Sequence, residues 1–184
     1  MIRVVDYGVG NIQAFLNLFK RLGFDAQRAA TPEGLLEATR LILPGVGHFD
    51  HAMQRLNDSG MRPLLDKGSE EGSLPGLNWL PGQVRAFANH PRSADLPMPH
   101  MGWNNLEICE SAPLFDEGFD GAPQFYFLHS YYFEAEDRSD VAATAHYGFD
   151  FDAVVSRGHI HGVQCHPEKS HHWGEQLLKN FVEV

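Results

Sequence analysis

The first half of the chain alternates short apolar runs with stretches in which apolar residues recur at helical spacing. Residues 2–5 form the first apolar run. Apolar side chains then recur every three or four positions up to a glycine: Ile12, Phe15, Leu16, Phe19, Leu22 and Gly23. This spacing predicts a strand and then a helix that ends at the glycine. Strands are also expected at about residues 24–28 and 41–43, which indicates a parallel sheet.

Helical patterns recur between and after these strands. Thr31 and Pro32 have the residue types of an N-cap and a first helical position. The periodicity resumes near residues 49–56 and again near residues 61–65. A parallel sheet that alternates with helices in this way is expected to be covered on both of its faces.

The second half has a different pattern, with strands that short turns connect. Apolar runs predict strands at residues 106–108, 125–128, 141–144 and 153–155, and residues 160–165 read as the return strand of a hairpin. The aromatic residues within 125–133 alternate along strands and are expected to lie mostly in the core. Residues 175–181 form a closing amphipathic helix. The sequence therefore predicts an α/β fold, a mixed sheet flanked by helices, with an antiparallel second portion and one domain over residues 1–184.

Composition excludes several classes of partner. The chain has 184 residues and a net charge of −10, and no cluster of lysine and arginine that would follow a nucleic-acid backbone or an anionic membrane. No apolar run approaches the roughly 20 residues that span a bilayer. The N-terminal residues read as a strand and not as a signal peptide. Two distant cysteines give no disulfide framework, so a cytoplasmic protein is expected.

The segment from Gly162 to Ser170 carries the strongest candidate chemistry. Its sequence, GVQCHPEKS, reads as a strand that ends in His-Pro-Glu. Pro167 cannot continue a strand ladder and forces a turn, so His166 and Glu168 can face the same way at the end of the sheet. Such a pair suits a general base and the acid that orients it. The alternative is a strand-end histidine followed by an exposed glutamate.

Two glycine-rich turns are weaker signals. In the first, Gly45 and Gly47 flank Val46 after an apolar strand, which would let a backbone N–H point at a developing oxyanion. A tight strand–helix turn explains this pattern equally well. The second turn, DYGVGN at residues 6–11, resembles half of a dinucleotide-binding fingerprint. Position 13 is glutamine where that fingerprint needs glycine, so the pattern does not favour a nucleotide cofactor.

Taken together, the order and spacing of these motifs resemble one family over essentially the whole chain. DYGVGN, LILPGVGHF, SEEG, PHMGWN, FYFLHSYYF and GVQCHPEKS resemble the glutaminase subunits of imidazole glycerol phosphate synthase, which are class I glutamine amidotransferases. The resemblance implies a flavodoxin-like fold and a Cys–His–Glu triad without a cofactor. It also implies L-glutamine as the substrate and a TIM-barrel cyclase partner that receives the ammonia in histidine biosynthesis.

The resemblance also implies roles for individual residues. His166 and Glu168 match the base and the orienting acid of the triad, and the region of Gly45, Val46 and Gly47 matches the oxyanion loop. Glu71 falls where the family helps to hold glutamine. A last group matches positions that face the cyclase partner around the ammonia passage: Asn11, Trp103, Tyr126 and Lys169.

The sequence departs from the family at the nucleophile. The family carries its cysteine on a strand–turn–helix elbow just before the SEEG segment, but here Asp66 is followed within four residues by Glu70, which belongs to that segment. A strand, the elbow and the start of its helix are absent, on the order of 15–20 residues. Two explanations are open: the molecule contains residues that the sequence omits, or the chain is shortened and lacks the nucleophile.

Neither remaining cysteine is expected to replace the missing one. Cys165 is adjacent to His166 in a strand, so the two side chains should point to opposite faces, and a buried thiol is expected. Cys109 follows an ordinary strand and has no histidine or acid placed beside it in the sequence. The chain as it stands is therefore predicted to be inactive as a glutaminase.

Other interpretations remain beside the main one. Eleven histidines invite a metal site, but no thiolates or His-x-x-x-His pair accompany them, so none is predicted. A sibling amidotransferase that supplies ammonia for amidino sugars of surface polysaccharides is an alternative, because the segment from Lys169 to Gly174 resembles it slightly more. A catalytically inactive subunit that docks on a barrel partner and regulates it is the alternative from a different functional class.

Overall fold

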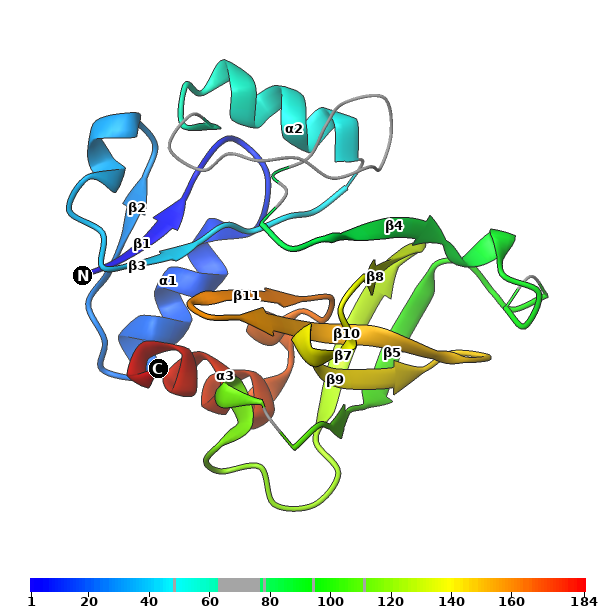
Figure 1. Cartoon of the computed structure of the whole chain (residues 1–184). Helices are drawn as coiled ribbons and strands as arrows, with labels where there is room; N and C mark the ends of the chain where they lie inside the picture. Colours follow the sequence, from blue (N-terminus) through cyan, green and yellow to red (C-terminus); the bar gives the residue numbers. More distant parts are fainter. Residues whose placement is uncertain (48, 63–76, 78, 94, 111) are drawn as a thin grey trace. The chain divides into compact units, whose positions relative to one another are not determined.

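The computed structural model describes residues 1–47, 49–62, 77, 79–93, 95–110 and 112–184 (Figure 1). Two compact units make up the chain, Met1–Trp79 and Leu80–Val184. The predicted junction near residues 66–70 and the candidate residue Glu71 lie outside the described residues. So does most of the helix that the sequence predicts at residues 61–65.

The N-terminal unit contains a three-stranded parallel sheet. Strand β1 (Ile2–Val5) lies between β2 (Ala26–Ala29) and β3 (Arg40–Ile42), as Figure 1 shows. Helix α1 (Ile12–Arg21) joins β1 to β2, and α2 (Phe49–Asp58) follows β3. The parallel pairing predicted from the sequence is therefore confirmed, although β2 begins two residues later and β3 one residue earlier than predicted.

Local capping signals define the ends of the first helices. Gly23 has a φ of +82°, and the N–H groups of Gly23 and Phe24 donate to the carbonyls of Lys20 and Phe19 at 3.2 and 2.9 Å. This is a Schellman motif, which the glycine makes possible because it tolerates a left-handed backbone. Thr31 does cap a helix through Gly34, but that helix is a single 3₁₀ turn, η1 (Pro32–Leu35).

The C-terminal unit is mostly antiparallel. Its larger sheet has the order β4-β8-β10-β9-β6, with β11 paired to β10, and β5 and β7 form a separate pair. Helix α3 (His171–Glu183) closes the chain. The strands have these bounds: β4 (Gly82–Ala86), β5 (His100–Asn105), β6 (Glu107–Ile108), β7 (Gln124–His129), β8 (Tyr131–Ala135), β9 (Val141–His146), β10 (Asp150–Arg157) and β11 (Ile160–Val163).

The sequence prediction captured most of these elements but not all. The hairpin of β10 and β11 and the antiparallel character of this half are confirmed. Strands β4 and β5 were not predicted. The closing helix begins four residues earlier than expected, at His171, because the His-Pro-Glu turn leads straight into it. The described residues of this unit also form four 3₁₀ turns: η3 (Phe87–Asn89), η4 (Pro113–Phe115), η5 (Arg138–Asp140) and η6 (Pro167–Lys169).

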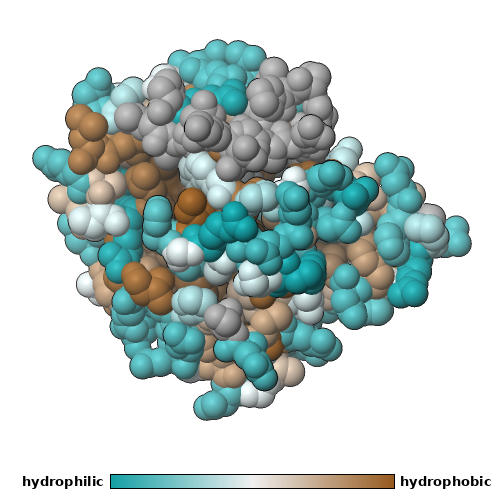
Figure 2. All heavy atoms as spheres, viewed as in Figure 1, coloured by the Kyte–Doolittle hydropathy of each residue, from teal (hydrophilic) through white to brown (hydrophobic). Residues whose placement is uncertain are grey.

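Each unit has a core of its own. In the C-terminal unit, Phe87, Phe125, Phe127 and Phe151 are fully or almost fully buried in one cluster with aliphatic residues of β9 and β10. In the N-terminal unit, the buried Val5 of β1 belongs to one cluster with Met53 and Leu56 of α2. On the face seen in Figure 2, hydrophilic residues predominate among the described residues, and hydrophobic ones form separate patches. No helix in the described part of the chain could span a membrane.

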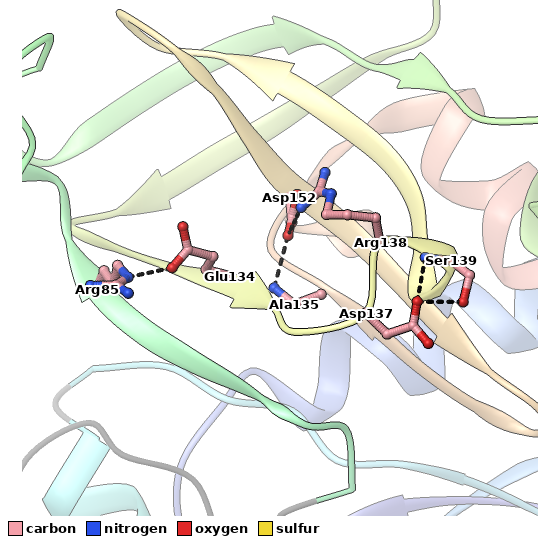
Figure 3. A network of polar contacts seen from close by, with 7 residues as sticks. All are labelled: Arg85, Glu134, Ala135, Asp137, Arg138, Ser139 and Asp152. Carbon is pink, nitrogen blue, oxygen red and sulfur yellow. Dashed lines mark hydrogen bonds and ion pairs between the residues drawn. The ribbon is translucent and has the colours of Figure 1, made fainter.

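A buried carboxylate fastens β10 to the end of β8. Asp152 accepts a hydrogen bond from the Ala135 N–H at 2.9 Å, and the Arg138 guanidinium donates to both of its carboxylate oxygens at 2.7 and 2.8 Å (Figure 3). The carboxylate is thereby paired and hydrogen-bonded, which is the condition under which a charge can be buried. This network stabilises the sheet from which the candidate site projects.

Candidate functional site

The His-Pro-Glu turn is held at the end of the β10–β11 hairpin. Backbone pairing continues one residue past β11, because the Gln164 N–H donates to the Ala153 carbonyl at 2.9 Å. Pro167 then begins the 3₁₀ turn η6. Helix α3 packs very closely on this turn: a Cβ on Gly174 would lie 1.9 Å from the Pro167 carbonyl oxygen. Only glycine allows this approach, so Gly174 helps to position the turn.

His166 and Glu168 face each other across this turn. The His166 Nδ1 lies 2.9 Å from the Glu168 Oε1, and the two side chains are only 15% and 5% exposed. A carboxylate can only accept a hydrogen bond, so Nδ1 is the donor of this bond and Nε2 is the ring nitrogen left available for proton transfer. This arrangement fits a base that an acid orients, and the shared direction of the two side chains is what the proline turn predicts.

Three of the four residues that the resemblance assigns to a partner interface lie together. Trp103 of β5 is directly opposite Tyr126 of β7, with ring centroids 6.1 Å apart, and the Lys169 Nζ lies 5.5 Å from the centre of the Tyr126 ring. The fourth, Asn11, belongs to the N-terminal unit. There its side chain caps α1 by accepting the Ala14 N–H at 3.2 Å.

The same surface includes three residues that the sequence prediction missed. Met101 and Leu128 are 64% and 41% exposed, and they oppose each other on the same side of β5 and β7 as Trp103. The His171 ring stacks on Trp103 at 5.1 Å between centroids. We call Met101, Trp103, Tyr126, Leu128, Lys169 and His171 the β5–β7 face. Alternation along two paired strands would have revealed Met101 and Leu128, but β5 was not predicted.

The glycine-rich loop that the sequence predicts as an oxyanion loop follows β3 in the N-terminal unit. Its first residue, Pro44, is buried, and the Tyr7 hydroxyl donates to the Pro44 carbonyl at 2.6 Å. Burial raises the pKa of Tyr7 to about 12, so the hydroxyl stays protonated and able to donate. Gly45, Val46 and Gly47 beyond it are exposed, and Gly47 has a φ of +82°. The loop is therefore anchored at its base and open beyond it.

A pair of histidines, His100 buried and His129 half-buried, lies across the β5–β7 pair, and the sequence prediction also missed it. The His100 Nδ1 is 2.9 Å from the His129 Nε2, and the His129 Nδ1 is 2.7 Å from the Tyr131 carbonyl oxygen. The Tyr131 carbonyl can only accept, so His129 donates from Nδ1. The Asn104 amide nitrogen, 3.3 Å from the His100 Nε2, can only donate, so His100 also donates from Nδ1 and both rings are neutral. Burial, the main cause, lowers the pKa of both His100 and His129 to about 4. His100 lies opposite His129 because of the register between β5 and β7. The pair could therefore not be predicted from a sequence analysis that missed strand β5.

Comparison with known proteins identifies the family. The chain is 47% identical to imidazole glycerol phosphate synthase subunit HisH of Bdellovibrio bacteriovorus and 40% identical to the protein of the same name from Leptospira borgpetersenii. Both alignments cover 100% of this chain and 100% of the relative. The chain belongs to the HisH family. No protein-family model matches it.

Solved structures confirm the fold class of this HisH family member. A crystal structure of a glutamine amidotransferase superposes with a TM-score of 0.71 at 19% identity, covering 100% of this chain and 98% of that one. A protein from Thermoplasma acidophilum that is assigned as a GMP synthase subunit gives the same TM-score and identity, covering 99% of this chain and 92% of that one. The predicted class I glutamine amidotransferase fold is therefore confirmed.

The HisH alignments also bear on the missing segment. The alignment with the Bdellovibrio protein spans 205 positions, whereas this chain has 184 residues, so at least 21 positions have no counterpart here. This deficit is close to the length predicted for the strand, elbow and helix start. The location of the gap beside Asp66 remains a prediction, because the junction lies outside the described residues.

The two cysteines of this HisH family member differ in their surroundings. Cys165 is buried in the core of the C-terminal unit, as predicted, and burial, with a smaller effect from the Glu168 charge, raises the pKa of its thiol. A thiol that stays protonated is a poor nucleophile. Cys109 is exposed and follows β6.

Among the described residues, no group of three or more His, Cys, Asp or Glu side chains could hold a metal ion.

Proposed function

We propose that this chain is the glutaminase-type subunit of an imidazole glycerol phosphate synthase and serves histidine biosynthesis in the cytoplasm. One observation carries the proposal: the hydrogen-bonded His166–Glu168 pair, 2.9 Å apart, on a turn that packs against α3. The names of the full-length relatives at 40–47% identity support the same assignment. The partner would be the cyclase subunit, with a TIM-barrel fold, that uses the ammonia.

In a chain that carries the elbow, the proposed chemistry is acyl transfer through the thiolate of its cysteine. The His166 Nε2 takes the thiol proton while Glu168 holds Nδ1–H, and the thiolate then attacks the amide carbon of glutamine. Backbone N–H groups near Val46 and Gly47 stabilise the oxyanion, and Glu71 helps to hold the substrate. The C–N bond breaks, ammonia leaves with the proton from His166, and water hydrolyses the thioester to glutamate.

The sequence as it stands supplies two of the three triad members, and this favours a second candidate function. The alignment deficit of 21 positions is close in length to the block that is predicted to carry the cysteine. Cys165 cannot act in its place, because its thiol is buried and its pKa is raised. A chain without the elbow would be a docking subunit that binds the cyclase but hydrolyses no glutamine.

Docking is supported by the β5–β7 face. Single exposed apolar side chains are common on protein surfaces, but here Met101, Trp103 and Leu128 cluster on one side of a two-stranded sheet. The Lys169 ammonium beside the Tyr126 ring adds a charge at this face. Aromatic and methionine side chains are enriched at the centres of protein interfaces. On the family resemblance, Asn11 of the N-terminal unit is also proposed to contact the cyclase.

The test separates catalysis from docking by restoring the missing block. The elbow segment of the Bdellovibrio relative is inserted between Gly68 and Ser69, and glutamate release is measured with the cyclase subunit present. We expect the restored chain to hydrolyse glutamine, and its His166→Ala variant to fold but release no glutamate. The unaltered chain should bind the cyclase and release none.

Two results would overturn these assignments. A restored chain that binds the cyclase but releases no glutamate contradicts the glutaminase proposal. Glutamate release by the unaltered chain that survives removal of both cysteines contradicts the triad.

A pair of substitutions tests docking. Trp103→Ala should weaken co-purification with the cyclase, and Tyr131→Ala should not. Tyr131 is a suitable control because it is exposed to a similar extent, at 44%, but belongs to β8. Equal effects of these two substitutions exclude the β5–β7 face.

A further inference from the structure

Ser170 is a buried serine whose hydroxyl does not make the contact expected from its position. It is the residue before α3, where a serine side chain ordinarily accepts a backbone N–H of the first helical turn. Here no such capping bond forms, and the side chain is completely buried. A buried hydroxyl needs partners, so its hydrogen bonds must go elsewhere.

Those partners are the backbones of His166 and Tyr126. The Ser170 Oγ donates to the His166 carbonyl at 2.6 Å and accepts the Tyr126 N–H at 3.0 Å. The His166 N–H in turn donates to the Tyr126 carbonyl at 2.8 Å. Both polar groups of the Tyr126 backbone are therefore bonded to the His-Pro-Glu turn, one directly and one through the serine hydroxyl.

The connection runs through the backbone and not through the rings. The Tyr126 and His166 ring centroids are 6.4 Å apart and tilted by 57°, so the two side chains share no hydrogen bond or stacked contact. Tyr126 meanwhile contributes its ring to the β5–β7 face, beside Trp103 and Lys169. One residue thus belongs to the face by its side chain and to the turn by its main chain.

The backbone next to the serine is strained. His171 has a φ of +48°, a left-handed conformation that residues other than glycine, asparagine and aspartate seldom adopt. Strain of this kind persists only where neighbouring interactions over-determine the backbone. The stacking of the His171 ring on Trp103, together with the two bonds of the Ser170 hydroxyl, supplies such interactions.

We propose that Ser170 is a positioning residue that couples the β5–β7 face to the His166–Glu168 pair. Its hydroxyl fixes the distance between the Tyr126 backbone and the His166 carbonyl, so a partner that displaces Tyr126 also moves the imidazole. The proposal rests on the proposed function, because that function makes one of these places a docking face and the other a catalytic base.

The experiment compares Ser170→Ala with Ser93→Ala in the full chain. Ser93 is a matched control: it is also completely buried in the C-terminal unit, and its hydroxyl donates to the Phe87 carbonyl at 2.7 Å. Its acceptors, the Phe87 and His90 carbonyls, are not part of the His-Pro-Glu turn. The readout is the NMR signal of the His166 imidazole, whose Nδ1 proton is shifted downfield by its hydrogen bond to Glu168, with urea unfolding measured in parallel.

We expect both substitutions to lower the stability, because each removes a buried hydrogen bond. Only Ser170→Ala should also shift the Nδ1 proton signal upfield and broaden it. When the cyclase subunit is added to the unaltered chain, the His166 signals should move. In Ser170→Ala the cyclase should still bind, but the His166 signals should respond less, because only the direct bond from the His166 N–H to the Tyr126 carbonyl remains.

Two results contradict the proposal: His166 signals that are identical in Ser170→Ala and the unaltered chain, or signals that Ser93→Ala changes as much. If Ser170→Ala does not fold, Ser170→Cys keeps most of the volume with a weaker donor, and unchanged His166 signals in that variant refute the coupling. A failure of the proposed function is distinguishable. It would appear as absent glutamate release by the restored chain or as absent cyclase binding, whereas the signals of the free chain test Ser170 without either.

Discussion

Lowering the pH from 7.5 to 5 should destabilise the C-terminal unit through the hydrogen-bonded pair of His100 and His129. The His100 Nδ1–H donates to the His129 Nε2, so a proton added to that acceptor would place two N–H donors face to face across 2.9 Å. Burial is the main cause that lowers the pKa of each imidazole from 6.5 to about 4. The unfolded chain therefore binds protons at pH 5–6 that the folded chain does not, and stability falls as the pH falls.

The magnitude follows from the two pKa values. A histidine with a pKa of about 4 when folded and 6.5 when unfolded loses about 2 kcal/mol of stability between neutral pH and pH 5, at about 1 kcal/mol per pH unit. The two rings share a hydrogen bond and titrate as a unit, so we expect about 2–4 kcal/mol for the pair. The stability contribution is fully present above pH 7 and is lost progressively as the pH falls towards 4.

Urea unfolding at several pH values between 5 and 7.5 measures this effect. Two of the three tryptophans, Trp103 and Trp173, lie in the C-terminal unit, so fluorescence reports mainly on it. The variant with both His100→Gln and His129→Gln has no titrating ring there, and its stability should change with pH by about 2–4 kcal/mol less. The exposed His51 of α2 provides the control, His51→Gln. If the double variant keeps the pH dependence of the unaltered chain, the pair is not its cause.

Three further predictions test the packing and the face. Asp152→Ala leaves the Ala135 N–H without its acceptor in a buried place, so urea unfolding should show a loss of about 2–4 kcal/mol, and a loss below about 0.5 kcal/mol contradicts this. Glycine to alanine ordinarily stabilises a helix by about 1 kcal/mol, but Gly174→Ala should destabilise the chain, because the new Cβ would overlap the Pro167 carbonyl. A higher unfolding midpoint for that variant refutes the packing. Lys169→Ala should leave the stability within about 0.5 kcal/mol, since the side chain is exposed, but should lower ammonia transfer from the restored chain to the cyclase. Unchanged transfer efficiency removes Lys169 from the passage.

The predictions from sequence succeeded where a signal was local. Gly23 ends α1 because a left-handed residue is needed for the two bonds of the Schellman motif, and that need is visible in the sequence. Pro167 likewise forces the turn that brings His166 and Glu168 together. The prediction of a buried Cys165 was also confirmed.

The two missed strands had no such signal. Strand β5 contains Gly102 and Asn104, residue types that are depleted in strands, and it forms because all six of its residues pair with β7. Strand β4 has only one β-branched residue, Val84, and pairs along its whole length with β8. Pairing energy that depends on a distant partner overrides local propensity, so these strands could not be read from their own residues.

The sequence by itself determined the family, the α/β class, the His-Pro-Glu motif and the absence of a cysteine where the elbow should be. These features depend on residue identity and on spacing along the chain. Only the tertiary structure decided the tautomers of His100 and His129, the membership of Met101 and Leu128 in an exposed face, and the bridging hydrogen bonds of Ser170. Each of these depends on which residues far apart in the sequence come within hydrogen-bonding or van der Waals distance, and short-range interactions of that kind leave no periodic pattern in the chain.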